Sequence, residues 1–84
     1  MTKTAYLINS IEDFGKLITY CIYNDISVWR TYYDDRDKGN FCCEINWKDK
    51  RCYYSSLYFY KNEGYTIVIP KFEIDKFGRV QLLN

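Results

Sequence analysis

Four cysteines are the residues of this chain whose chemistry could most directly serve a metal or a redox reaction. Cys42 and Cys43 are adjacent, Cys21 and Cys52 stand apart, and the chain contains no histidine. Zinc sites usually combine closely spaced cysteines, often with histidine, and that spacing is missing. We therefore expect four reduced, buried thiols with a structural role, with a disulfide or a metal site as the alternatives.

A run of aspartates raises the question of a calcium loop. Asp34, Asp35 and Asp37 precede Gly39, and alternating carboxylates around a glycine turn can bind Ca²⁺. The spacing does not match, because Gly39 falls on a ligand position and Asn40 stands where the loop requires glycine. We interpret the segment as a polar turn whose exposed carboxylates are available to a basic partner.

The side chains needed for catalysis do not occur in a recognisable pattern. Histidine, the usual proton acceptor near neutral pH, is absent, and the four glycines are scattered along the chain. A catalytic nucleophile needs a neighbouring base, and a phosphate-binding loop needs clustered glycines. We expect a protein that is not an enzyme and that uses no cofactor.

Aromatic side chains dominate the composition instead. The chain has ten tyrosines, five phenylalanines and two tryptophans among 84 residues. A domain of this length buries only about 60% of its unfolded surface, so several rings should remain exposed. Tyrosine is common in strands, yet an exposed tyrosine also offers rigid contact area with a polar tip. The composition favours a protein that binds another macromolecule.

Charge and hydropathy limit the partners and the compartment. The 12 basic and 11 acidic residues give a net charge of +1, which leaves little surplus for non-specific binding to a phosphate backbone. Residues 1–10 lack the apolar run of a signal peptide, and no stretch approaches the roughly 20 apolar residues of a membrane span. We expect one compact domain over residues 1–84, located in the cytoplasm.

The clearest predicted element is a helix over residues 10–24. Ser10 and Asp13 have the spacing of an N-terminal cap, and Asn24 with Asp25 provides the stop. Apolar residues recur at helical spacing and form one stripe. The stripe consists of Ile11, Phe14, Leu17, Ile18, Cys21 and Ile22.

Strands are predicted at residues 3–8, 27–33, 41–47 and 65–74, the last followed by a turn at 75–78 and a short hairpin ending near Leu82. Pro70 suits an edge position in the last of these strands. The segment 41–47 alternates, which predicts two faces. Phe41, Cys43, Ile45 and Trp47 should face the core, while Cys42, Glu44 and Asn46 should face outward.

The segment 51–60 admits two interpretations. Its aromatic residues suit a strand, but it has no β-branched residue, and Lys61 to Gly64 reads as the last turn of a helix. The helical interpretation, which we favour, gives the order βαββαβ of a ferredoxin-like fold, with an antiparallel sheet and both helices on one face. The strand interpretation gives one helix on an antiparallel meander. Both are α+β.

The βαββαβ order resembles that of RNA-recognition modules, which stack bases on aromatic rings of two central strands. Residues 5–9 resemble the first signature of those modules, and Lys38, Gly39 and Phe41 resemble the start of the second. The resemblance implies a small module that binds single-stranded nucleic acid. It fails on the strand 41–47, where Glu44 would repel phosphate on the face that should carry rings.

The predicted outward face of the sheet is the surface on which we expect a partner to bind, together with the acidic turn. Mixed apolar and charged residues around tyrosine and arginine are typical of protein interfaces. The predicted outer face also includes Ile8, Cys42, Ile67 and Ile69. The candidate partner-binding residues are Tyr6, Arg30, Tyr32, Asp34, Asp35, Asp37, Glu44, Asn46, Lys71 and Glu73.

Two functions follow from these patterns as hypotheses. In the first, a small non-catalytic protein docks on a larger protein or ribonucleoprotein. The AT-rich codon bias implied by abundant Ile, Lys and Asn suggests a virus-encoded inhibitor of a host nucleic-acid machine, similar to an anti-CRISPR. In the second, a single-stranded nucleic-acid module contacts phosphates through Lys48, Lys50, Arg51 and Lys71. A homodimer is compatible with either.

Overall fold

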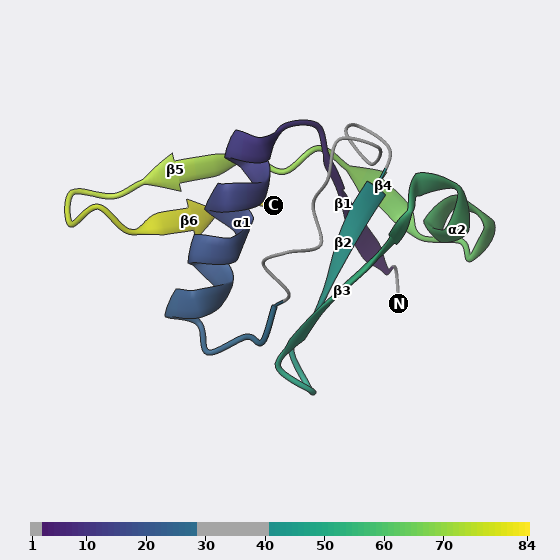
Figure 1. Cartoon of the computed structure of the whole chain (residues 1–84), viewed down its shortest axis with the longest axis horizontal. Helices are drawn as coiled ribbons and strands as arrows, with labels where there is room; N and C mark the ends of the chain where they lie inside the picture. The colour runs from purple at the N-terminus through teal and green to yellow at the C-terminus, as the bar shows by residue number, and fades with distance from the viewer. Residues whose placement is uncertain (1–2, 29–40) are drawn as a thin grey trace.

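The computed structural model of the chain describes residues 3–28 and 41–84. The predicted α+β class is confirmed, and Figure 1 shows the arrangement. The elements in chain order are β1 (Thr4–Ile8), α1 (Ile11–Tyr23), β2 (Phe41–Asn46), β3 (Arg51–Ser56), α2 (Leu57–Asn62), β4 (Thr66–Val68), β5 (Phe72–Ile74) and β6 (Val80–Leu82).

Four of the strands form one mixed sheet in the order β3-β2-β1-β4. The pairs β1–β2 and β2–β3 are antiparallel, but β4 runs parallel to β1. The expected antiparallel sheet is therefore wrong at one edge, and the arrangement is not a clean ferredoxin pattern. Within the part of the chain that the structure describes, β5 and β6 pair only with each other, as a separate antiparallel hairpin.

The predicted helix over residues 10–24 is confirmed almost to the residue. Ser10 is the N-cap, and its hydroxyl oxygen accepts a hydrogen bond of 3.1 Å from the Asp13 amide. Asn24 is the C-cap, and its side chain donates to the Tyr20 carbonyl at 2.8 Å. Phe14, Leu17 and Cys21 of the predicted stripe are buried, so α1 lies against the sheet along the face that its apolar periodicity defines.

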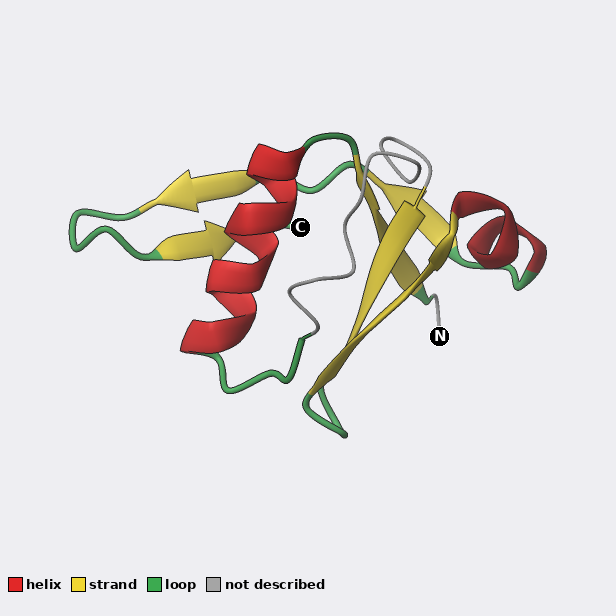
Figure 2. Ribbon diagram, viewed as in Figure 1, coloured by secondary structure: helices red, strands yellow, loops and turns green. Residues whose placement is uncertain are grey.

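The two helices cover opposite faces of the sheet, which corrects the expectation that both lie on one face (Figure 2). On the α1 face, the helix packs with Ile8, Phe41, Cys43 and Cys52. On the α2 face, Tyr60 packs with Ala5 and Cys42. Because neighbouring strand residues point to opposite faces, both members of the pair Cys42 and Cys43 are fully buried.

The segment 51–60 divides between strand and helix, so each interpretation holds for part of it. Residues 51–56 pair with β2 along their whole length. Ser56 then takes an extended conformation and caps α2, because its hydroxyl accepts a 3.0 Å hydrogen bond from the Phe59 amide. The result is a helix of only six residues, shorter than predicted.

The predicted strand 65–74 is interrupted. β4 ends at Val68 and β5 begins at Phe72, with buried Pro70 between them. The side chain of Asn84 fixes this interruption, since it donates to the Ile69 carbonyl and accepts from the Lys71 amide, both at 3.0 Å. The predicted hairpin through residues 75–78 is confirmed by the pairing of β5 with β6. Of the predicted strand 27–33, Ser27 bridges Arg51, and residues 29–33 lie outside the described residues.

Removing the Asn84 amide should loosen the attachment of the hairpin to the sheet. We expect Asn84→Ala to lower the free energy of unfolding by about 1–2 kcal/mol, the usual contribution of two hydrogen bonds. Urea denaturation followed by circular dichroism would measure the change. Asn62→Ala, at an exposed position in α2, is the control and should change stability by less than about 0.5 kcal/mol. Equal effects of the two substitutions would contradict a specific role for Asn84.

Candidate interaction surfaces

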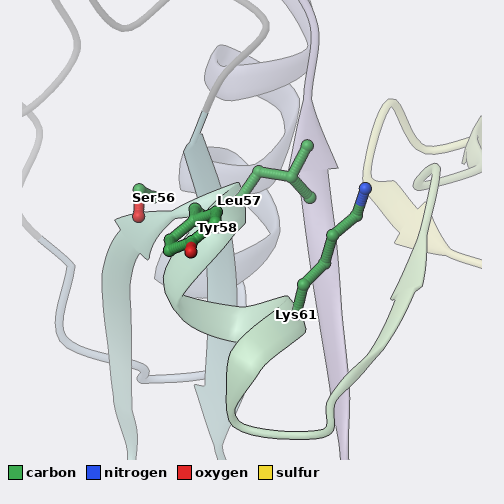
Figure 3. Close-up of a pocket in the computed structure, with 4 residues that line it drawn as sticks. All are labelled: Ser56, Leu57, Tyr58 and Lys61. Atoms are coloured by element: carbon green, nitrogen blue, oxygen red, sulfur yellow. The ribbon is translucent and has the colours of Figure 1, made fainter.

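The short helix α2 presents two aromatic side chains to solvent. Tyr58 is 75% exposed and Phe59 45% exposed, whereas the next residue, Tyr60, is buried. Ser56, Leu57, Tyr58 and Lys61 line a shallow, open pocket of about 290 Å³ (Figure 3). We call Ser56, Leu57, Tyr58, Phe59 and Lys61 the α2 surface. Exposed aromatic side chains beside a hollow are typical of protein interfaces.

Buried Tyr60 anchors α2 to the sheet. Its ring meets Phe59 at a centroid distance of 5.2 Å and Tyr65 at 4.8 Å, both edge to face. Gly64, with φ of 79°, then ends the helical segment in a left-handed conformation that suits glycine. The Tyr65 hydroxyl donates a 2.7 Å hydrogen bond to the Glu44 carboxylate of β2. The exposed rings are therefore carried on an element tied to the sheet at several points.

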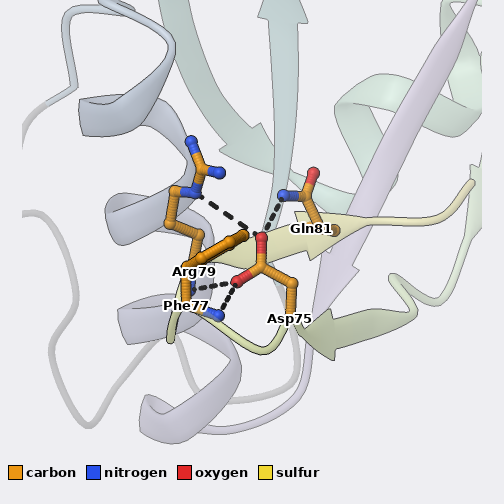
Figure 4. A network of polar contacts seen from close by, with 4 residues as sticks. All are labelled: Asp75, Phe77, Arg79 and Gln81. Atoms are coloured by element: carbon orange, nitrogen blue, oxygen red, sulfur yellow. Dashed lines mark hydrogen bonds and ion pairs between the residues drawn. The ribbon is translucent and has the colours of Figure 1, made fainter.

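A second exposed ring lies at the tip of the β5–β6 hairpin. Asp75 organises this turn: its carboxylate accepts hydrogen bonds from the Phe77 and Arg79 amides at 2.9 Å and from the Gln81 side chain at 3.3 Å (Figure 4). Arg79 Nε lies 3.5 Å from the same carboxylate. The hydrogen bond from the Arg79 amide is the main cause that lowers the pKa of Asp75. Phe77, at the end of this turn, is 70% exposed.

The turn between β2 and β3 is the third aromatic and basic feature. Asn46 holds this turn, since its side chain accepts from the Asp49 amide at 3.0 Å and donates to the Asp49 carboxylate at 3.2 Å. Lys50 adopts φ of 56°, an uncommon conformation for a residue with a side chain. The ammonium group of Lys50 lies 5.1 Å from the centre of the Trp47 ring. Lys50 therefore covers one side of this half-exposed indole.

All four cysteines are part of the core, and Cys42, which the alternation of residues 41–47 placed on the outward face, is buried with the others. All four are buried and none is in a disulfide. Cys21, Cys43 and Cys52 lie in the cluster on the α1 face, and Cys42 in the cluster on the α2 face. A hydrogen bond with Cys52, together with burial, raises the pKa of the Cys21 thiol well above its usual range. Among the described residues, no group of three or more acidic, cysteine or histidine side chains could hold a metal ion.

The sequence-predicted site residues that the structure describes do not share one face. Tyr6 pairs with Cys43 and so lies on the α1 face, where its hydroxyl donates to the Asn84 carbonyl. Glu44 lies on the α2 face, next to Tyr65. Ile8, expected on the outer face, is fully buried against α1. The single outer face proposed from alternation is therefore wrong, because each face of the sheet is covered by its own helix.

The remaining predicted residues are dispersed. The Asn46 side chain forms hydrogen bonds within the β2–β3 turn, Lys71 lies between β4 and β5, and Glu73 is exposed on β5. Lys48 and Lys50 lie in the β2–β3 turn and Arg51 starts β3, so Lys71 is on a different part of the fold from these three. Arg30, Tyr32, Asp34, Asp35 and Asp37 lie outside the described residues.

Tyr58, Phe59 and Phe77 were missed as candidate residues. The predicted helix over 51–60 was centred several residues too early, and the outward direction of Tyr58 and Phe59 depends on where α2 starts. For Phe77 a signal was present, because the sequence Asp75 to Gly78 was identified as a turn. A large aromatic residue inside a predicted turn has few neighbours that could bury it.

Comparison with protein-family models, curated proteins and solved structures finds no match for this chain. The helices of the described segments are all too short or too polar to cross a membrane.

Stability should decline in alkali. The hydrogen bond to Glu44, with burial, raises the pKa of Tyr65 from 10.0 to about 12, and burial raises that of Cys42 from 9.0 to about 11. Such groups stabilise the fold fully below their unfolded pKa, and this contribution is lost as the pH rises through the folded pKa. We expect urea denaturation to show a constant stability up to about pH 9 and a fall toward pH 12. The free energy of unfolding of Tyr65→Phe should fall less steeply with pH than that of the unmodified protein. An unchanged slope above about pH 9 would contradict the contribution assigned to Tyr65.

The buried thiols should be unreactive in the folded protein. Alkylation requires a thiolate, and all four cysteines are buried. We expect iodoacetamide at mildly alkaline pH to alkylate none of them in the native protein and all four after denaturation in urea, with iodide as the leaving group. A cysteine that reacts in the native protein as fast as in urea would contradict the packing described for it.

Proposed function

We propose that this protein is a non-catalytic binding protein that docks on a larger protein through the α2 surface. The observation that carries the proposal is the exposed ring of Tyr58, which lines the pocket on a helix anchored by buried Tyr60, with half-exposed Phe59 next to it in the chain. Tyrosine is enriched among residues that dominate binding energy, and a fixed ring loses little conformational freedom on binding. Lys61, at the rim of the pocket, suits a partner with an acidic residue nearby.

The partner class that we would test first is a nucleic-acid machine of a low-GC bacterium. The support is compositional, since the codon bias fits such a bacterium or one of its viruses. In this proposal the protein acts by occupying a surface of its target. An antagonist of a host nuclease complex, of the anti-CRISPR kind, is a specific form of this proposal.

The test is capture of partners by the tagged chain from a bacterial lysate treated with nuclease, followed by affinity measurement with the purified partner. We expect Tyr58→Ala to weaken binding by at least about 1 kcal/mol, because an exposed interface tyrosine is truncated. Phe77→Ala removes a ring of similar exposure, 70% against 75%, from the hairpin tip and serves as the matched control.

The proposal requires that Tyr58→Ala lose the partner while Phe77→Ala retains it. Binding that survives Tyr58→Ala and Phe59→Ala would exclude the α2 surface. Loss of every partner on nuclease treatment would instead favour the nucleic-acid module.

A further inference from the structure

The hairpin tip carries an exposed ring in a fixed position. Phe77 is 70% exposed, while the turn beneath it is fixed by the Asp75 carboxylate and by two backbone hydrogen bonds of 2.9 Å, from Asp75 to Arg79 and from Gly78 to Asp75. Gly78, with φ of 80°, permits this tight turn. The backbone that carries the ring is thus ordered by hydrogen bonds, which limits the backbone entropy lost on binding a ligand.

Two cations accompany this ring. Lys76 Nζ lies 5.2 Å and the Arg79 guanidinium carbon 5.5 Å from the centre of the Phe77 ring. Both distances are within the range of a cation–π contact. The hairpin tip, which we define as residues 76–79, therefore combines an apolar stacking surface with two positive charges.

The acidic residue of the turn faces inward. Asp75 is the one acid in the segment 75–79, and its carboxylate is engaged by the Phe77 and Arg79 amides, by Gln81 and by Arg79 Nε. Figure 4 shows the terminal nitrogens of Arg79 directed away from Asp75. Those nitrogens and the Lys76 ammonium can therefore donate to an external anion while Asp75 positions the arginine.

We propose that the hairpin tip binds single-stranded nucleic acid, with one base stacked on Phe77 and neighbouring phosphates contacted by Lys76 and Arg79. Every base offers a π-face to an aromatic ring, and the flanking phosphates supply negative charge. Bases are accessible for such stacking only in a single strand. This site is distinct from the basic β2–β3 turn. Stacking of a base on Phe77 requires Lys76 and Arg79 to leave the ring face, and in doing so they become available to the neighbouring phosphates.

The proposal is independent of docking through the α2 surface. In Figure 1, α2 and the β5–β6 hairpin lie at opposite ends of the longest axis of the molecule, which spans 38 Å. A chain docked through α2 would leave the hairpin tip free to contact nucleic acid held by its partner. Variants at the two ends therefore test the two proposals separately.

The experiment is fluorescence anisotropy of a labelled oligouridylate of about 15 nucleotides, titrated with the full chain between roughly 50 and 200 mM salt. Phe77→Ala should weaken binding about fivefold or more, and Tyr58→Ala, equally exposed at the other end, should leave it unchanged. The two phosphate contacts predict a slope of log affinity against log salt of about −1.4. Lys76→Gln should change the salt slope to about −0.7, whereas Lys61→Gln in α2 should leave it at about −1.4.

Three outcomes would overturn the proposal. One is the absence of binding by the unmodified chain at the lowest salt concentration. Another is an equal loss of affinity in Phe77→Ala and Tyr58→Ala, with both variants shown to be folded by circular dichroism. The third is equal affinity for a duplex of the same length, which would exclude base stacking and leave only charge attraction.

Discussion

The central strands β1 and β2 are buried on both faces, and the rest of the structure follows from this double burial. Ala5 and Ile8 point to opposite faces of β1, as do Cys42 and Cys43 of β2, and none of the four is exposed. A sheet whose two faces are both apolar needs a cover on each side. The chain supplies α1 for one face and the short α2 for the other.

Each helix covers only part of its face of the sheet, and the β5–β6 hairpin adds further cover on the α1 face. Phe72 and Leu82 of the hairpin pack against the α1-face cluster, which extends the core beyond the sheet. Among residues 3–28 and 41–84, no corresponding element extends the α2 side, and the six residues of α2 bury Tyr60 but leave Tyr58 and Phe59 exposed. The most exposed aromatic residues, Tyr58 and Phe77, are therefore found at opposite ends of the molecule.

The two proposed surfaces share one physical design. In each, the backbone that carries an exposed ring is held by a neighbouring residue whose interactions are satisfied inside the protein: Tyr60 by packing under α2, and Asp75 by hydrogen bonds in the hairpin turn. Fixing an aromatic side chain before binding reduces the entropy lost in the complex. The surfaces differ in charge environment, since two cations flank Phe77 and one, Lys61, adjoins Tyr58.

Local signals in the sequence determined the elements that depend on local interactions. The Ser10 cap, the central part of the apolar stripe of α1 and the turn after Asp75 are set by residues within a few positions of one another, and each was predicted correctly. The outer members of that stripe, Ile11 and Ile22, are exposed instead. The alternation of β2 correctly placed Phe41 and Cys43 in the core, but it was wrong for Trp47, which is half-exposed, and for Cys42, which is buried. Only the tertiary structure decided the parallel pairing of β4 with β1, the opposite faces of the two helices and the split of residues 51–60. These features depend on contacts between distant residues, and the same contacts place Tyr58 and Phe77 on the surface while burying Ile8.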